Sequence, residues 1–205
     1  MADAALREVL TEVRDNMRIS WDVPIPMSDG TILRADIFRP TDENPCPVIM
    51  SHGCYAKGLS FQEAYAAQWE RMTRDFPQIT QGTSGKYQCW EVADPERWVP
   101  QGYVVIDADS RGAGSSPGML DPFSPREIDD YATLITWAAH QTWSSGKVGL
   151  IGTSYQAINQ WMVAARQPEG LAAILPWDGA FDYYRESPST VEYSIPHGNF
   201  GGITR

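Results

Sequence analysis

The sequence predicts an α/β fold built around a mostly parallel sheet. Four short runs are almost uniformly apolar, and helical stretches separate them: residues 47–51, 103–108, 148–151 and 171–175. Strands of a parallel sheet are covered on both faces, so they are apolar throughout rather than alternating. Before the first run, apolar residues alternate on either side of a turn at Ser28 to Gly30, which indicates an antiparallel hairpin at the sheet edge.

The N-terminal residues are expected to form an amphipathic helix. Over residues 3–17, apolar side chains recur at helical spacing, at Leu6, Val9, Leu10, Val13 and Met17. The hairpin then runs from Ile19 to Phe38 and leads into the first parallel strand.

Two capping boxes predict the starts of two further helices. Ser60 is followed by Glu63, and Ser124 by Glu127, with Pro125 at the first helical position of the second helix. The first helix is expected to carry one apolar side, Phe61, Tyr65, Trp69 and Met72. The second is expected to run to about His140 with an inward face of Ile128, Tyr131, Leu134, Ile135 and Ala138.

Composition excludes several classes of function. The formal net charge is −10, which disfavours binding to a phosphate backbone. No segment approaches the roughly 20 apolar residues of a membrane helix, and the charged N-terminus is unlike a signal peptide, so we expect a cytoplasmic protein. The three cysteines, Cys46, Cys54 and Cys89, favour a reducing compartment. His52 and Cys54 alone do not make a zinc site, and we expect no metal or cofactor.

Ser154 is the first candidate for chemistry. The run "KVGLIGTSYQAINQWMVAA" places it between an apolar strand and a helix-like stretch. A serine nucleophile is often exposed at such a strand-to-helix turn in a G-x-S-x-G motif. Gly152 fits that motif, but Gln156 stands where the second glycine belongs. From the residues alone, Ser154 is either a nucleophile or the N-cap of an ordinary helix, with a phosphate-binding loop a distant third.

Two loops carry further candidates. Residues 52–55, "HGCY", follow the first parallel strand, where α/β hydrolases place an oxyanion-hole donor; the alternative is a turn glycine beside a packed tyrosine. The glycines at 112, 114 and 118 resemble a dinucleotide fingerprint, but Pro117 and Pro122 prevent the helix that would hold a pyrophosphate. Arg111 could bind a substrate carboxylate or pair with Asp107 or Asp109 to fix the loop.

Together, the motifs resemble the cocaine-esterase and X-Pro dipeptidyl-peptidase group of α/β-hydrolase serine hydrolases. The matching stretches run in family order: "SDGTILRADIFRP", "HGCYAKGLSFQ", "CWEVADPERWVPQGYVVIDADSRGAGSSPG", "FSPREIDDY", "WSSGKVGLIGTSYQAINQW" and "WDGAFDYYRE". The family elbow commonly reads G-x-S-Y-x-[GA], which accommodates Gln156 and Ala157. The resemblance implies that Ser154 is the nucleophile, and that the Tyr155 backbone N–H and the Tyr55 hydroxyl form the oxyanion hole.

The resemblance also implies an α/β-hydrolase core that is truncated before its last strands. The family has eight core strands, with the catalytic acid and histidine after the seventh and eighth, and this sequence reaches Arg205 first. His197 is a weak candidate for the base, and Asp178 and Asp182 are expected to be loop or pocket carboxylates. We therefore divide the chain into residues 1–18 (N-terminal helix), 19–185 (partial core) and 186–205 (start of a cap).

Two functions remain open at this point. The first is a serine hydrolase that cleaves a small ester or a peptide-like amide through a Ser154 acyl-enzyme, present here as a fragment without its acid and histidine. The second is an inactive relic or an interaction subunit. The sequence does not choose between an esterase and a dipeptidyl-peptidase, and it leaves the oligomeric state open.

Overall fold

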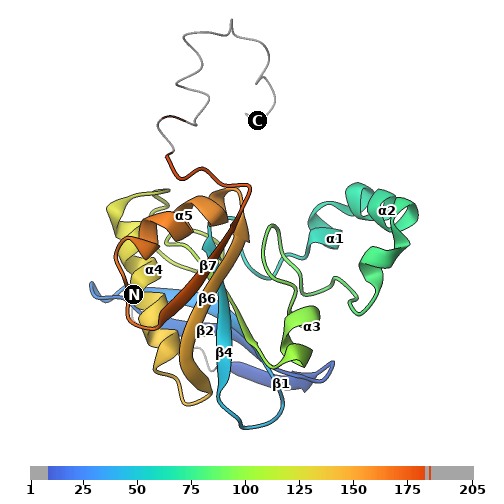
Figure 1. Cartoon of the computed structure of the whole chain (residues 1–205), viewed down its shortest axis with the longest axis horizontal. Helices are drawn as coiled ribbons and strands as arrows, with labels where there is room; N and C mark the ends of the chain where they lie inside the picture. The colour runs from blue at the N-terminus through green and yellow to red at the C-terminus, as the bar shows by residue number, and fades with distance from the viewer. Residues whose placement is uncertain (1–8, 183–184, 186–205) are drawn as a thin grey trace, which may run out of the picture.

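The computed structural model describes residues 9–182 and 185, and these form a mixed sheet flanked by helices (Figure 1). The strand order is β1-β2-β3-β5-β4-β6-β7; β4 pairs in parallel with β5 and β6, β6 pairs in parallel with β7, and the β1–β2, β2–β3 and β3–β5 pairs are antiparallel. The strands are β1 (Leu10–Arg14), β2 (Met17–Pro26), β3 (Ile32–Arg39), β4 (Cys46–Gly53), β5 (Val104–Asp109), β6 (Ser144–Thr153) and β7 (Leu171–Trp177). The predicted α/β class, with an antiparallel hairpin leading into parallel strands, is confirmed.

Helices cover both faces of this sheet, as its apolar strands require. They are α1 (Phe61–Ala64), α2 (Ala66–Asp75), α3 (Pro95–Trp98), α4 (Pro125–Ala139) and α5 (Tyr155–Ala164), with short 3-10 turns η1 (Pro77–Thr80) and η2 (Val99–Gln101). Helices α4 and α5 lie on one side of the sheet and α3 on the other (Figure 1). None of the helices in the described part of the chain is long and apolar enough to cross a membrane.

Alternation along the central strands divides the core into two clusters. In β5, Val104 and Ile106 belong to the cluster beneath α4, whereas Val105 belongs to the opposite cluster. The predicted inward face of α4 is buried in full, and Tyr131, Leu134 and Ile135 have no exposed surface. Strands β4 and β5 therefore contribute to both layers, which is why their sequences lack polar alternation.

The N-terminal segment differs from the prediction. Residues 1–8 lie outside the described part of the chain, but Leu10–Arg14 is a strand, not a helix, and pairs antiparallel with β2. Asp15 and Asn16 both have positive φ, 49° and 60°, as a two-residue hairpin turn requires. Leu10 and Val13 are exposed rather than buried, so their helical spacing does not correspond to a face that packs on the core. The boundary placed at residue 18 is therefore wrong, since β1 and β2 belong to the core sheet.

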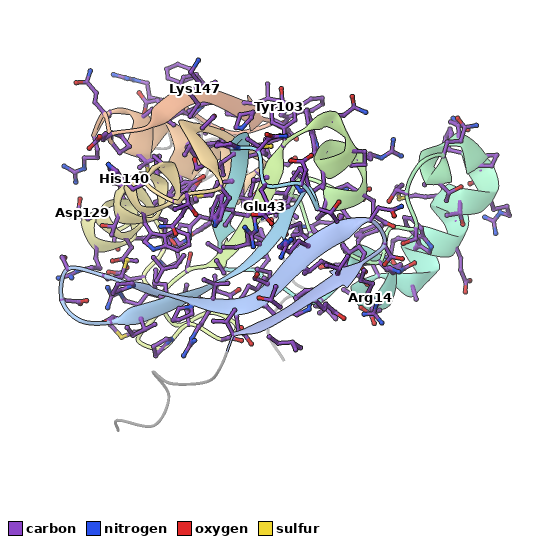
Figure 2. The ribbon with its side chains drawn as sticks, turned by 90° about the horizontal axis from the view of Figure 1, so that it is seen from below. Arg14, Glu43, Tyr103, Asp129, His140 and Lys147 are labelled. Atoms are coloured by element: carbon purple, nitrogen blue, oxygen red, sulfur yellow. The ribbon has the colours of Figure 1, made fainter. Side chains whose placement is uncertain are left out.

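The segment that follows β4 and contains α1, α2 and η1 forms an arm that projects from the body of the molecule. Figures 1 and 2 both show α2 apart from the sheet. The capping box is present, because the Glu63 carboxylate accepts hydrogen bonds from the Ser60 N–H and hydroxyl. The single predicted helix is instead two, interrupted at Tyr65, whose φ of −132° is not helical. None of the residues of α1, α2 or η1 is buried. The apolar side of the arm thus faces an open cleft rather than the core.

Candidate active site

Ser154 occupies a strained turn between β6 and α5. Its φ of 55° and ψ of −117° lie in a sparsely populated region that costs a non-glycine residue about 1–3 kcal/mol. Two backbone hydrogen bonds hold this conformation, from the Ser154 N–H to the Trp177 carbonyl (3.0 Å) and from the Thr153 N–H to the Glu91 carbonyl (3.2 Å). Within the described residues, the Ser154 side chain makes no capping hydrogen bond. The hydroxyl therefore does not perform the function expected of an N-cap serine.

Glycine contacts explain how Gln156 replaces the second glycine of the elbow motif. A Cβ at Gly152 would lie 2.5 Å from Gln156 Cβ, and a Cβ at Gly53 would lie 3.0 Å from Gln156 Cγ. The Gln156 side chain passes through the space that these two glycines leave, and its Nε2 donates to the Trp90 carbonyl at 3.1 Å. A Cβ at Gly179 would similarly lie 2.4 Å from Ala157 Cβ, so position 179 has no room for a side chain next to α5.

The two predicted oxyanion donors lie next to the elbow. Tyr155 is the first residue of α5, where the backbone N–H has no intrahelical acceptor. The Tyr55 ring meets the Tyr155 ring edge-to-face, with 5.9 Å between centroids. Burial, and then the charge of Glu91, raise the pKa of Tyr55 to about 12, so its hydroxyl is protonated and able to donate at neutral pH. Tyr55 is still 41% exposed, which leaves it within reach of a ligand.

Lys57 fixes the loop that carries Tyr55. The Lys57 side chain is almost buried, and its Nζ lies 2.5 Å from an Asp22 oxygen and 3.0 Å from an Asp36 oxygen. The Lys57 backbone N–H donates to Asp109 at 2.8 Å. The loop that follows β4 is therefore tied to β2, β3 and β5.

A buried carboxylate beneath the elbow was not predicted from the sequence. Glu127, expected to be a capping residue, is 4% exposed and accepts hydrogen bonds from the Tyr155 hydroxyl, the Ser110 hydroxyl (2.7 Å) and the Phe123 N–H (2.7 Å). The Ser124 hydroxyl accepts from the Glu127 N–H at 3.2 Å, as in a capping box. Glu127 thus links the start of α4 to the first residue of α5. The capping-box motif of Ser124 and Glu127 does not predict this second role.

The described histidines do not contact Ser154. His52 is 1% exposed and packs against the Tyr131 ring, and burial lowers the pKa of its imidazole. His140 lies on the surface at the end of α4, 3.4 Å from a Glu169 oxygen, on the side of the molecule away from the arm (Figure 2). His197, the weak candidate for the base, lies outside the described residues. Asp182 is ion-paired with Arg185, in keeping with a loop carboxylate.

The glycine loop after β5 is held by an arginine, but not by the predicted partners. Arg111 makes ion pairs with Asp130 (2.9 Å) and Asp29 (3.0 Å) rather than with Asp107 or Asp109. The prediction of a loop-fixing role is correct and the predicted partners are wrong, because the side chain extends across the start of α4 to the hairpin turn. The next helix begins only at Pro125, so the glycines of this loop do not open into a helix N-terminus.

Asp107 is a buried acid without a partner among the described residues. It is 3% exposed, and neither carboxylate oxygen makes a hydrogen bond there. Burial raises the pKa of this carboxyl well above its ordinary value, and the charges of Asp36 and Asp109 raise it further. Asp107 lines a cavity of about 20 Å³ that Tyr55 and Gln156 also line.

We expect Asp107→Asn to stabilise the protein at alkaline pH. A carboxyl with a raised pKa in the folded state contributes stability below the unfolded pKa of about 4 and loses it as pH rises through the folded value. An amide carries no such cost, so the free energy of unfolding at pH 8 should rise by about 1–3 kcal/mol. Urea unfolding from pH 4 to pH 8 measures the effect, with the exposed Asp121→Asn as control. Equal pH profiles for Asp107→Asn and the parent chain would refute the assignment.

No cluster of three or more His, Cys, Asp or Glu side chains among residues 9–182 and 185 is arranged to hold a metal ion. The three cysteines are free, with Cys46 and Cys89 buried and Cys54 partly so.

Comparison with known proteins finds similar sequences and similar structures. The family model described as X-Pro dipeptidyl-peptidase (S15 family) matches residues 29–200. The chain is 30% identical over 174 residues to the cocaine esterase of a Rhodococcus species, covering 84% of this chain and 26% of that protein. A CocE/NonD family hydrolase from Staphylococcus aureus is similar in structure, with a TM-score of 0.71 and 38% identity over 83% of this chain and 29% of that one.

A more distant structure shows the fold alone. An aminopeptidase from a marine sediment thaumarchaeon has a TM-score of 0.58 at 20% identity, covering 90% of this chain. The chain spans about a quarter of the length of the cocaine esterase that it resembles. Since the family model matches well over half of the chain, and the strand order and elbow agree with an α/β-hydrolase core, the chain belongs to the X-Pro dipeptidyl-peptidase family, S15.

Proposed function

We propose that this chain carries the nucleophilic part of a serine hydrolase that cleaves a small ester or a peptide-like amide. The observation that carries the proposal is the conformation of Ser154, which is strained, held by backbone hydrogen bonds and unused as a helix cap. A strained backbone conformation is maintained only where the surrounding structure enforces it, and residues in such conformations are commonly functional. Family membership supports a hydrolase, and the choice of serine as nucleophile rests on this geometry.

In the proposed reaction, Ser154 Oγ attacks the carbonyl carbon of the substrate. The Oγ–C bond forms, the Oγ proton passes to a general base, and the carbonyl oxygen becomes an oxyanion that the Tyr155 N–H and the Tyr55 hydroxyl stabilise. Collapse expels the alcohol or amine, which takes the proton from the base and leaves an acyl-enzyme on Ser154. Water then hydrolyses the acyl-enzyme by the same route, releasing the acid.

The general base is not one of the described histidines. His52 is buried in the central strand β4 with its ring against Tyr131, and His140 is on the surface at the end of α4, so neither is placed to receive the Oγ proton. In the proposal, the histidine and its carboxylate partner come from outside residues 9–182 and 185. Removing triad members leaves the contribution of the oxyanion hole and of binding, about 10³–10⁴ over the uncatalysed reaction.

We expect a fluorophosphonate probe to modify Ser154 slowly, and added imidazole to accelerate the reaction. In this reaction Ser154 Oγ displaces fluoride from phosphorus, and a diffusible base can accept the proton that a histidine takes in the proposed reaction. Peptide mass spectrometry would locate the modification at Ser154, and the rate should increase about tenfold or more with imidazole, as expected for general-base catalysis. Tyr55→Phe should slow the reaction, because it removes one oxyanion donor while keeping the ring.

The control variant is Ser154→Ala, which should remove the modification at every imidazole concentration. Modification spread over several surface serines, or a Ser154 rate that imidazole leaves unchanged, would contradict the proposal. Complete lack of labelling would favour an inactive relic or an interaction subunit instead.

A further inference from the structure

A second cleft lies between the arm and the body of the molecule. Its volume is about 350 Å³, within the range of small-molecule sites. The arm contributes Phe61, Trp69 and Met72, and the facing loop contributes Trp90 and Glu91. The cleft is therefore built largely from the apolar side of a helix that has no buried residues.

Aromatic rings form one wall of this cleft. The Trp90 ring lies 5.4 Å from the Phe61 ring and 4.5 Å from the Tyr65 ring, at interplanar angles of 27° and 31°. The Trp69 ring meets Phe61 edge-to-face at 6.3 Å and packs directly over Gly85. Nearly parallel rings of this kind favour a flat aromatic guest that can stack or pack against them.

A buried acceptor stands at the edge of the aromatic wall. Glu91 accepts a hydrogen bond from the Trp90 side chain, but its Oε2 is buried and makes no hydrogen bond within residues 9–182 and 185. Its backbone φ of 62° is rare for a glutamate. Leaving a buried carboxylate oxygen unpaired is costly, so a donor on a bound ligand would be strongly favoured.

The second charged group of the cleft already has partners. Arg97 donates to the Ile79 carbonyl at 2.6 Å and lies 3.5 Å from an Asp94 oxygen. An anionic ligand would be repelled by Glu91, and a cationic ligand would have to desolvate its charge in a cleft that already holds the Arg97 guanidinium. The combination fits a neutral ligand that brings its own O–H or N–H donor.

The cleft adjoins the proposed catalytic site. Cys89 and Trp90 line both the cleft and the small cavity that contains Tyr55 and Gln156. The Glu91 carbonyl accepts the Thr153 N–H, immediately before Ser154. A group bound in the cleft would therefore be separated from the elbow only by the segment that contains Trp90 and Glu91.

We infer that this cleft binds a planar aromatic group carrying a neutral hydroxyl or N–H donor, and that it receives the aromatic part of the substrate. The second half of the inference rests on the proposed function. The aromatic wall provides the stacking surface and Glu91 Oε2 accepts the donor.

Binding of four small probes to the 205-residue chain tests the first half. The pair p-cresol and 4-methylanisole differs only in the donor, and benzylammonium and benzoate add a positive and a negative charge. Titrations followed by tryptophan fluorescence or ligand-observed NMR should give p-cresol a Kd on the order of 0.1–1 mM. We expect p-cresol to bind about tenfold more tightly than each of the other three, because only it gives Glu91 a neutral donor.

Three variants locate the binding. Glu91→Leu should remove the preference for p-cresol over 4-methylanisole while both still bind, and Trp69→Ala should weaken both by about fivefold. Phe76→Ala is the matched control, because Phe76 is an exposed aromatic of the same arm that does not line the cleft. Near-UV circular dichroism confirms that each variant is folded. Equal affinities for the matched pair in the parent chain, or unchanged binding in folded Trp69→Ala, would overturn the assignment.

Competition with the fluorophosphonate probe tests the second half. Saturating p-cresol should change the rate of Ser154 labelling by threefold or more, since the two cavities share a wall. Binding without any effect on labelling would overturn the role as a substrate subsite. If Ser154 is never labelled, the proposed function fails separately, and the titrations still decide which ligand the cleft takes.

Discussion

Purified alone, the 205-residue chain should hydrolyse p-nitrophenyl acetate at a rate that Ser154→Ala leaves unchanged. The elbow and its oxyanion donors are in place, but neither described histidine can take the Ser154 proton. Loss of triad members costs on the order of 10⁴–10⁶ in rate. That loss would bring Ser154-dependent turnover below the background hydrolysis of an activated ester.

The measurement compares initial rates for the chain, its Ser154→Ala variant and buffer, without imidazole. Because the same preparation should be labelled at Ser154 when imidazole is present, misfolding can be distinguished from a missing base. Robust turnover that depends on Ser154 would show that a base is available within these 205 residues. His197 would then be the first candidate for substitution.

Much of the fold could be predicted because its sequence signals are local. Apolar runs bounded by turn residues located β4 to β7, and helical spacing located the buried face of α4, including Tyr131. The elbow could be located from Gly152 and the strand before it, although Gln156 broke the simple motif. That substitution is explained by contacts with Gly152 and with Gly53 and Trp90, the last two of which are distant in sequence.

The errors arose where long-range pairing decides the outcome. The spacing of Leu10 and Val13 suits a helix, yet the segment pairs with β2 because Asp15 and Asn16 turn the chain back. Arg111 has acidic neighbours in sequence, but it pairs with Asp29 and Asp130, which the fold brings to it. The capping role of Glu127 was predicted correctly from its neighbours in sequence. Those neighbours do not predict the hydrogen bond from the Tyr155 hydroxyl of α5.

The largest expected effect on stability is that of Glu127→Ala. The Glu127 carboxylate accepts from three donors, the hydroxyls of Ser110 and Tyr155 and the Phe123 N–H, and Glu127 itself is buried. Alanine supplies no acceptor, so the buried hydroxyls of Ser110 and Tyr155 and the partly buried Phe123 N–H all lose this acceptor at once. Each unsatisfied buried group costs about 1–3 kcal/mol, and we expect the free energy of unfolding to fall by about 3–5 kcal/mol.

The same substitution should also affect Ser154, which separates this network from an ordinary core contact. Tyr155 contributes the proposed oxyanion N–H, and its ring is held between Phe123 and Tyr55 while its hydroxyl is held by Glu127. Glu127→Gln keeps one acceptor oxygen, so its losses of stability and of imidazole-dependent labelling should be intermediate. Glu63→Ala, which removes the exposed carboxylate of the α1 capping box, should cost about 1 kcal/mol. Urea unfolding decides the point: a loss below 1 kcal/mol in Glu127→Ala would show that the three donors find other partners, and that the elbow does not depend on this carboxylate.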